Sequence, residues 1–286
     1  MPTAVIAFDF DPILRIGNGG VRLETVGLAL VILVSLALAG LIARSMQLRL
    51  DDLLFVVLGV VPGAVVGGRV GYVLLHPAFF GADPSRVVDP GIGSLELTLG
   101  VVGGALTGVL VATLLDGRPG RWLHAATLPT LFVLGAGKLA MVLGGRGQGE
   151  PWNGETATAF LGPGPWGSLA PDVPSHPSQV YEAIAAFLVL LVVLVLIAVI
   201  GRLTRGAVTR PDGRLFVIGL ALWSVGRAVV ASTWRDPTLA GPLRTEQLID
   251  IAVILGCMVV LARLARRPVE AEDETESVEF ASEVTG

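Results

Sequence analysis

The chain has 286 residues, of which 53% are hydrophobic and only 15% charged, and its mean hydropathy is +0.75. Soluble domains carry roughly 25% charged residues, so this composition argues against a soluble class and indicates a polytopic membrane protein. The net charge of −4 does not describe the whole chain, because seven of the 24 acids crowd into the segment after Arg267 and the remaining residues carry +3. No nucleic-acid partner is expected. The single cysteine, Cys257, excludes an intrachain disulfide.

Residues 1–24 read as a short segment preceding the first membrane span. A helix needs about 20 apolar residues to cross the hydrocarbon layer. Seven stretches satisfy this length, at 25–43, 53–75, 96–115, 122–143, 180–200, 214–233 and 246–262. The sequence therefore predicts an all-α fold, a seven-helix transmembrane domain over residues 25–262.

Two long connections, 76–95 and 144–179, fall on the side of the membrane that also holds the N-terminus. The second is rich in glycine and proline and carries Trp152 and Trp166, and tryptophan favours the membrane interface. We expect it to form a small outer cap, although its composition equally fits a flexible connector. Residues 263–286 are expected to form an acidic, disordered tail.

The distribution of arginine predicts the orientation of the bundle. Loops on one side hold eleven arginines, whereas the N-terminus and the loops on the other side hold six. Positively charged loops tend to stay in the cytoplasm. The N-terminus is therefore expected outside and the tail in the cytoplasm.

Three basic residues lie inside predicted spans: Arg69, Lys138 and Arg227. Buried charge is costly in a membrane, so these side chains should face the interior of the bundle. The acids at similar depth stand only near span ends, namely Glu96, Glu182, Glu246 and Asp250. An excess of buried cation predicts an anionic guest such as an anionic phospholipid, although Arg69 and Arg227 could instead snorkel to the interface.

A polar string, "HPSQVYE", runs directly into the fifth span. Ser175 or Ser178 is expected to cap this helix, with Pro177 in its first turn. The string would place four polar side chains over the mouth of the bundle: His176, Gln179, Tyr181 and Glu182. His176 is the candidate general base. The alternative is that these groups only tie the outer loop to the bundle.

Three segments together resemble the prolipoprotein diacylglyceryl transferase family: "GGRVGYVLLHPAFF", "HPSQVYE" and "GRLFVIGLALWSVGRAVVASTWRDP". The resemblance covers roughly residues 20–262. It implies transfer of diacylglyceryl from phosphatidylglycerol to the lipobox cysteine of a bacterial prolipoprotein signal peptide, with release of glycerol phosphate at the outer face of the cytoplasmic membrane. It implies no metal and no other cofactor. The expected catalytic residues are His176 and Arg227, and the expected substrate-binding residues are Arg69, Lys138, Gly149, Gln179, Tyr181 and Glu182.

The chain departs from the family pattern at several site positions. Thr98 stands where the family has a histidine, and Lys138 replaces an arginine. Further replacements are Val26 for tyrosine, Met141 and Gly144 for asparagines, Arg146 for glutamate and Ala231 for glutamate. These losses leave open a catalytically inactive paralogue that binds lipid or lipoprotein. A small-molecule transporter gains support only from the buried cations.

Overall fold

The computed structural model describes residues 5–17, 19–89, 92–115, 117–200 and 211–266. The acidic tail from residue 267 onward lies outside these ranges. Within them, the chain forms the expected helical bundle, with seven helices long and apolar enough to cross a membrane. They are α1 (Leu23–Ser45), α2 (Leu50–Leu75), α4 (Leu97–Leu115), α5 (Pro119–Val142), α6 (Ser178–Val195, extended by the π-helical η2, Leu196–Ile200), α8 (Arg214–Val230, extended by the 3-10 turn η3, Ala231–Thr233) and α9 (Thr245–Ala265).

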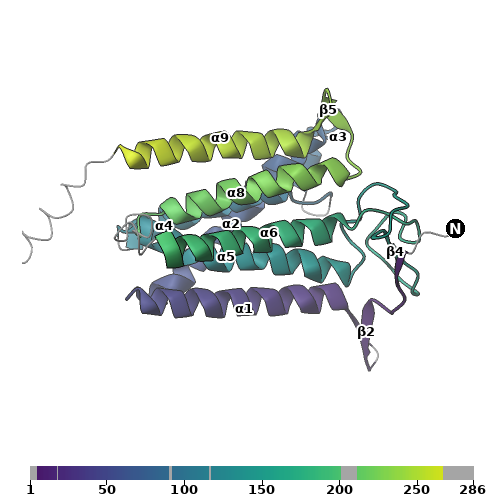
Figure 1. The fold of residues 1–286 in the computed structure, drawn as a ribbon, viewed down its shortest axis with the longest axis horizontal. Helices are drawn as coiled ribbons and strands as arrows, with labels where there is room; N and C mark the ends of the chain where they lie inside the picture. The colour runs from purple at the N-terminus through teal and green to yellow at the C-terminus, as the bar shows by residue number, and fades with distance from the viewer. Residues whose placement is uncertain (1–4, 18, 90–91, 116, 201–210, 267–286) are drawn as a thin grey trace, which may run out of the picture.

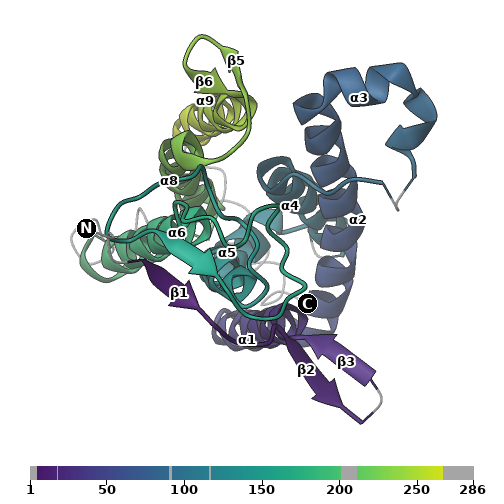
Figure 2. The same ribbon diagram turned by 90° about the vertical axis from the view of Figure 1, so that its right-hand side faces the viewer.

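The seven helices run side by side along the long axis of the molecule (Figure 1). Viewed along that axis, α5 lies centrally and α1, α6 and α8 surround it, while α2 and α9 stand at the periphery (Figure 2). Helix α5 packs against α1, α4, α6 and α8, and α9 packs mainly against α8. The apolar core between α5, α6 and α8 contains Leu131, Leu134, Ala186, Val189, Val193, Leu215 and Trp223.

Helices α2 and α4 approach each other closely through glycine. Gly59, Gly63, Gly67 and Gly71 recur at every fourth position of α2 and so share one face. A Cβ on Gly63 would lie 2.3 Å from the carbonyl oxygen of Gly103 on α4. This spacing is the small-residue pattern that lets membrane helices touch backbone to backbone.

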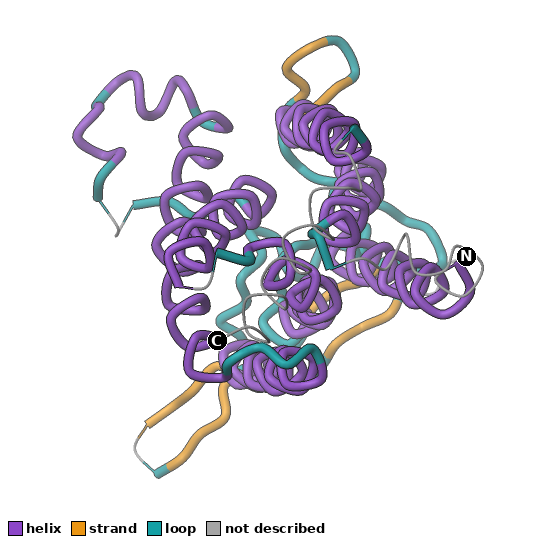
Figure 3. Tube along the Cα trace, turned by 90° about the vertical axis from the view of Figure 1, so that its left-hand side faces the viewer, coloured by secondary structure: helices purple, strands orange, loops and turns teal. Residues whose placement is uncertain are grey.

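One end of the bundle, here named the cap end, carries the remaining elements (Figure 1). They are the helix α3 (Pro77–Ala82), the turn η1 (Pro84–Val87) and six short strands: β1 (Ile6–Phe8), β2 (Ile13–Ile16), β3 (Gly19–Arg22), β4 (Thr158–Phe160), β5 (Thr238–Ala240) and β6 (Leu243–Arg244). Figure 3 shows the strands as short orange segments outside the helices. None of the strands was expected from the sequence.

The connection between α5 and α6 forms the expected cap. Its strand β4 pairs in parallel with β1 of the N-terminal segment, with Ala7 opposite Ala159. Phe160 is buried and stacks on Phe8 with ring centroids 5.0 Å apart, and Trp166 lies 4.9 Å from Phe160. The N-terminal segment and the cap are therefore one packed unit above the helices.

Candidate active site

Five ionisable side chains meet inside the bundle near the cap end, and we name them the charge cluster: Lys138, Arg227, Glu96, Glu182 and Asp250. Arg227 on α8 is at the centre. Its Nη2 lies 3.1 Å from Glu96 Oε1, its Nη1 lies 3.3 Å from Glu182 Oε2, and its Nε lies 3.7 Å from Asp250 Oδ2. Only 4% of Arg227 is exposed. The guanidinium thus joins four elements of the bundle.

Lys138 on α5 is the second buried cation. Its Nζ lies 2.6 Å from Glu182 Oε2, so one carboxylate bridges both cations. The ring of Trp234, which follows η3, lies 4.9 Å from Lys138 Nζ and 5.4 Å from the guanidinium carbon of Arg227. A cation above an aromatic face is stabilised by the quadrupole of the ring. Sequence reasoning missed Trp234.

The tight contact between α2 and α4 fixes the position of Glu96. The residue precedes α4, and its carboxylate accepts hydrogen bonds from the amides of Thr98 and Leu99, each at 2.7 Å. These are amides of the first helical turn, which lack partners inside the helix. Glu96 N also donates to Gly68 O at 2.8 Å, and a Cβ on Gly71 would lie 2.7 Å from Glu96 Cβ. Glycine on α2 therefore makes room for this carboxylate.

Asp250 on α9 binds Thr98, the residue predicted from the sequence to stand at the family's histidine position. Thr98 Oγ1 donates to Asp250 Oδ1 at 2.8 Å, and both residues are fully buried. The other oxygen, Oδ2, has no hydrogen-bond partner in the described part of the chain. Glu246, four residues earlier on α9, is also buried, and its Oε2 has no hydrogen-bond partner among the described residues.

The expected excess of buried cation is wrong for the described residues. Within the charge cluster three carboxylates face two cations, and Glu246 adds a fourth buried acid. The acids do stand near helix ends, as the sequence indicates. The helix ends that carry these acids meet within reach of the long side chains of Lys138 and Arg227. The place of each acid within its own span therefore did not reveal its ion pair with a cation on another helix.

Arg69 lies outside the charge cluster. Its guanidinium donates to the carbonyl oxygens of Val87 at 2.7 Å, Ile92 at 2.6 Å and Asp89 at 3.0 Å, and also to that of Arg86. The guanidinium of Arg69 is therefore bound by backbone carbonyl oxygens of the protein. It holds the segment between α3 and α4 against α2, directly before Glu96.

The polar string at the start of α6 divides between the cap and the charge cluster. His176 stacks on Trp152 with ring centroids 4.3 Å apart and lies 6.2 Å from the ring of Tyr181. Among the described residues, it makes no hydrogen bond or ion pair to the cluster, and its Nδ1 has no partner. Gln179 is fully buried, and neither polar atom of its amide has a partner in the described structure. Glu182 belongs to the cluster.

The expected serine cap of α6 is wrong. The residue before the helix is Pro177, and no side chain caps its amides. Ser178 Oγ instead lies 2.6 Å from Thr233 Oγ1, while Ser175 Oγ donates to Val173 O. Ser178 thus connects α6 to η3, whereas the Ser175 bond stays within the cap.

Gly149 lies at the crossing of the cap, α6 and η3. Its amide donates to His176 O at 2.8 Å, and a Cβ there would lie 2.1 Å from Thr233 O and 2.2 Å from Ser178 Oγ. Arg235, missed in the sequence, donates from Nε to Gly149 O at 2.6 Å. Only glycine fits this crossing.

Arg146, predicted from the sequence to stand at a glutamate position of the family, pairs outside the charge cluster. Its Nε lies 3.3 Å from Glu24 Oε2 at the start of α1. A Cβ on Gly144 would lie 2.2 Å from the same carboxylate oxygen. The positive charge of Arg146 is thus paired with the carboxylate of Glu24. Gly144 has no side chain and so leaves room for that carboxylate.

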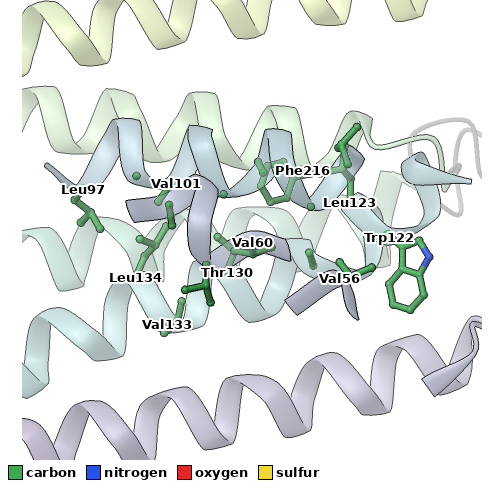
Figure 4. A pocket seen from close by; sticks show the side chains of 18 of the residues that line it. Val56, Val60, Leu97, Val101, Trp122, Leu123, Thr130, Val133, Leu134 and Phe216 are labelled. Atoms are coloured by element: carbon green, nitrogen blue, oxygen red, sulfur yellow. The ribbon is translucent and has the colours of Figure 1, made fainter. Parts of the chain in front are cut away.

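An apolar cavity of about 520 Å³ runs along the bundle between α2, α4, α5 and α8. Leu97 and Trp122 lie at its two ends, with Val60, Thr130 and Val133 between them (Figure 4). Glu96 also lines it, so its cap end adjoins the charge cluster. Among the described residues, no group of three His, Cys, Asp or Glu side chains could hold a metal ion.

Comparison with known proteins extends the resemblance across the whole bundle. The model of the family described as prolipoprotein diacylglyceryl transferase matches residues 13–263. Phosphatidylglycerol–prolipoprotein diacylglyceryl transferases are similar to this chain: that of Clostridioides difficile is 23% identical over 79% of this chain and 83% of the relative. That of Geobacter sulfurreducens is 29% identical with the same coverage of both chains, and that of Trichormus variabilis is 26% identical over 93% of this chain and 92% of the relative.

The match begins in β2 and ends in α9, so it contains every residue of the charge cluster as well as the cap. This chain belongs to the prolipoprotein diacylglyceryl transferase family.

Proposed function

We propose that this protein transfers a diacylglyceryl group from phosphatidylglycerol to the cysteine thiol of a prolipoprotein. One observation carries the proposal: buried Arg227 pairs with Glu96, which lines an apolar cavity, and a second buried cation, Lys138, is joined to Arg227 by Glu182. A phospholipid likewise has a charged part and an apolar part, with its headgroup at one end and its acyl chains at the other. The names of the relatives support phosphatidylglycerol as the donor.

In this proposal the acyl chains lie along the apolar cavity and the phosphate faces Arg227 and Lys138. Glu182 bridges these cations at 3.3 and 2.6 Å, so an entering phosphate must shift that carboxylate. Arg227 also keeps an Nε without a hydrogen-bond partner in the described structure. Guanidinium groups bind phosphate oxygens through two parallel hydrogen bonds, which favours Arg227 as the residue that orients the headgroup.

The transfer forms a bond from the thiol sulfur to the terminal glycerol carbon of the diacylglyceryl group. The bond from that carbon to the phosphate oxygen breaks, and glycerol phosphate leaves with the electron pair. Cations placed where this charge develops stabilise the transition state, which is the role proposed for Arg227 and Lys138. The thiol proton passes to a base, because the thiolate is the nucleophile.

We assign the proton acceptor to His176. Thr98 cannot accept a proton near neutral pH, whereas an imidazole can. The ring of His176 lies in the cap beside the start of α6, and its Nδ1 has no partner among the described residues. Gln179, whose buried amide also has no partner there, and Tyr181 are proposed to contact the headgroup or the signal peptide.

The proposed setting is a bacterial cytoplasmic membrane, with the N-terminus and the cap on the outer side and the C-terminus in the cytoplasm. The arginine distribution supports this orientation, because the sequence assigns eleven arginines to the side predicted to be cytoplasmic and six to the other side. The acceptor is then a prolipoprotein signal peptide presented at the outer face.

Complementation tests the proposal. The chain is expressed in a bacterium whose own diacylglyceryl transferase can be shut off, and the mobility of one lipoprotein is followed on gels. We expect rescue by the unchanged chain and by Arg263→Ala, which changes an exposed arginine at the opposite end of α9. We expect no rescue by Arg227→Ala or His176→Ala.

Each failure has a separate meaning. If the unchanged chain is present in the membrane but does not rescue, while an intact relative does, the protein is a lipid-binding relative without the chemistry. If Arg227→Ala abolishes rescue and His176→Ala does not, the transfer stands and the assignment of the base is wrong.

A further inference from the structure

The hairpin of β2 and β3 projects sideways from the bundle at the cap end. In Figure 1 it extends below α1 just beyond the start of that helix, and in Figure 2, viewed along the helices, it points away from every other element. The strands are antiparallel, with Leu14 opposite Val21 and Ile16 opposite Gly19. A segment that leaves a membrane bundle sideways at the end of its helices lies over the surrounding lipid.

The two faces of the hairpin differ in chemistry. Side chains alternate between the faces of a strand, and opposed residues share a face. One face therefore carries Leu14, Ile16 and Val21 and no polar side chain. The other carries Ile13, Arg15 and Arg22.

A hydrogen bond from Arg22 shows which face of the hairpin is turned toward the cap. Arg22 Nη2 donates to the carbonyl oxygen of Pro165 in the cap, at 3.3 Å. The arginine face is thus turned toward the cap, and the face with Leu14, Ile16 and Val21 is turned away from it. These three residues are 44%, 65% and 40% exposed, so the described part of the chain leaves this apolar face open in part.

The hairpin continues directly into a helix that faces lipid. Helix α1 begins at Leu23, the residue after β3. Its exposed residues include Leu30, Ile32, Leu33 and Val34, as expected for a helix at the edge of a membrane bundle. The hairpin is therefore joined without a linker to a helix whose exposed side chains are apolar.

We infer that the hairpin is a lipid-binding arm that inserts its apolar face into the membrane interface beside the bundle. Leu14, Ile16 and Val21 would lie at the boundary of headgroups and acyl chains, as in an amphipathic interfacial segment. Arg15, on the opposite face with its side chain 77% exposed, pairs with Asp11 Oδ2 at 3.4 Å and would stay on the water side of the arm. Because Arg22 binds the cap and β1 pairs with β4, this arm would anchor the cap to the bilayer.

The single cysteine allows a direct depth measurement. In a Cys257→Ser background, Ile16→Cys is labelled with an environment-sensitive fluorophore, and the full chain is reconstituted in vesicles of phosphatidylcholine and phosphatidylglycerol. The matched control is Leu169→Cys, because Leu169 is 99% exposed on the cap. Quenching is measured with lipids spin-labelled near the headgroup and with aqueous iodide.

We expect the lipid quencher to act at least about twofold more strongly on the Ile16→Cys label than on the control, and iodide to act less. Equal iodide quenching at both positions overturns the inference, since the arm would then stand in water. Protection of the Ile16→Cys label from both quenchers also overturns it, because a second protein chain would then cover the face. A repeat with Leu14→Cys excludes a local effect of the label.

Discussion

At the scale of single residues, Arg227 determines the character of the site. Three carboxylates from other segments face its guanidinium, and one of them also binds Lys138. Removing one partner of a buried ion pair leaves an uncompensated charge, whereas replacing both partners by neutral groups is far less costly. The cost of each substitution in the charge cluster therefore depends on which partners remain.

The bridge made by Glu182 gives a specific ranking of stability. Glu182→Gln leaves Lys138 without its ion-pair partner and should lower the free energy of unfolding by about 3 kcal/mol, whereas Lys138→Met leaves Glu182 paired with Arg227 and should cost less. The double substitution should recover part of the loss of Glu182→Gln. Unfolding of the purified variants in detergent measures all three, and an equal or larger cost for Lys138→Met would contradict the bridge.

Thr98 is expected to act as a hydrogen-bond donor. Thr98→Val keeps the shape but leaves Asp250 Oδ1 buried without its donor, which should cost about 1–3 kcal/mol. Thr98→Ser keeps the hydroxyl and should lose much less. Melting temperatures of the two variants test this, and an equal loss in both would contradict it, because the methyl group would then contribute as much as the hydroxyl.

The sequence predicted single residues of the site only in part. Arg227 and Lys138 were found because charges inside apolar spans are conspicuous, and Glu182 because it stands in a recognisable string. The roles of Asp250 and Trp234 depend on which helix ends meet, and one sequence does not contain that information. An Asp and a Glu four residues apart near the start of a span were the available signal for α9.

At the scale of elements, all seven spans were predicted within about three residues, because apolar length alone defines them. The strands were missed for a physical reason. β1 and β4 have three residues each and lie about 150 residues apart, so no local pattern reveals their pairing. The hairpin did have a signal, a Gly-Asn pair between residues 13–16 and 19–22.

The α2–α4 contact predicts different tolerance at two glycines. Gly63→Ala would place a Cβ 2.3 Å from Gly103 O and 2.1 Å from Thr107 Oγ1, so the helices must separate and Glu96 must move. We expect poor folding and loss of rescue in the complementation assay. The control is Gly256→Ala on α9, where nothing lies within 4 Å and alanine is the better helix former. Equal behaviour of both variants would mean that the close contact is not required.

At the scale of the whole molecule, the cap is attached to three parts of the chain. β1 joins it to the N-terminal segment, Arg235 joins it to the end of α8, and Arg244 at the start of α9 donates to Glu150 at 2.6 Å. The charge cluster lies beneath it. Under the proposed function, a lipid would reach the cations from the side, along the apolar cavity that Glu96 lines.

The proposed orientation of the whole molecule makes opposite predictions for its two ends. In the Cys257→Ser background, Leu169→Cys is on the cap, and Ser45→Cys is exposed at the end of α1 remote from it. A membrane-impermeant maleimide added to intact cells should modify the Leu169→Cys variant and leave the Ser45→Cys variant unmodified until the membrane is permeabilised. In Gram-negative hosts, the reagent must first pass the outer membrane, so spheroplasts are used. The reverse pattern would place the cap in the cytoplasm, and a substrate presented at the outer face could then not reach the cap or His176.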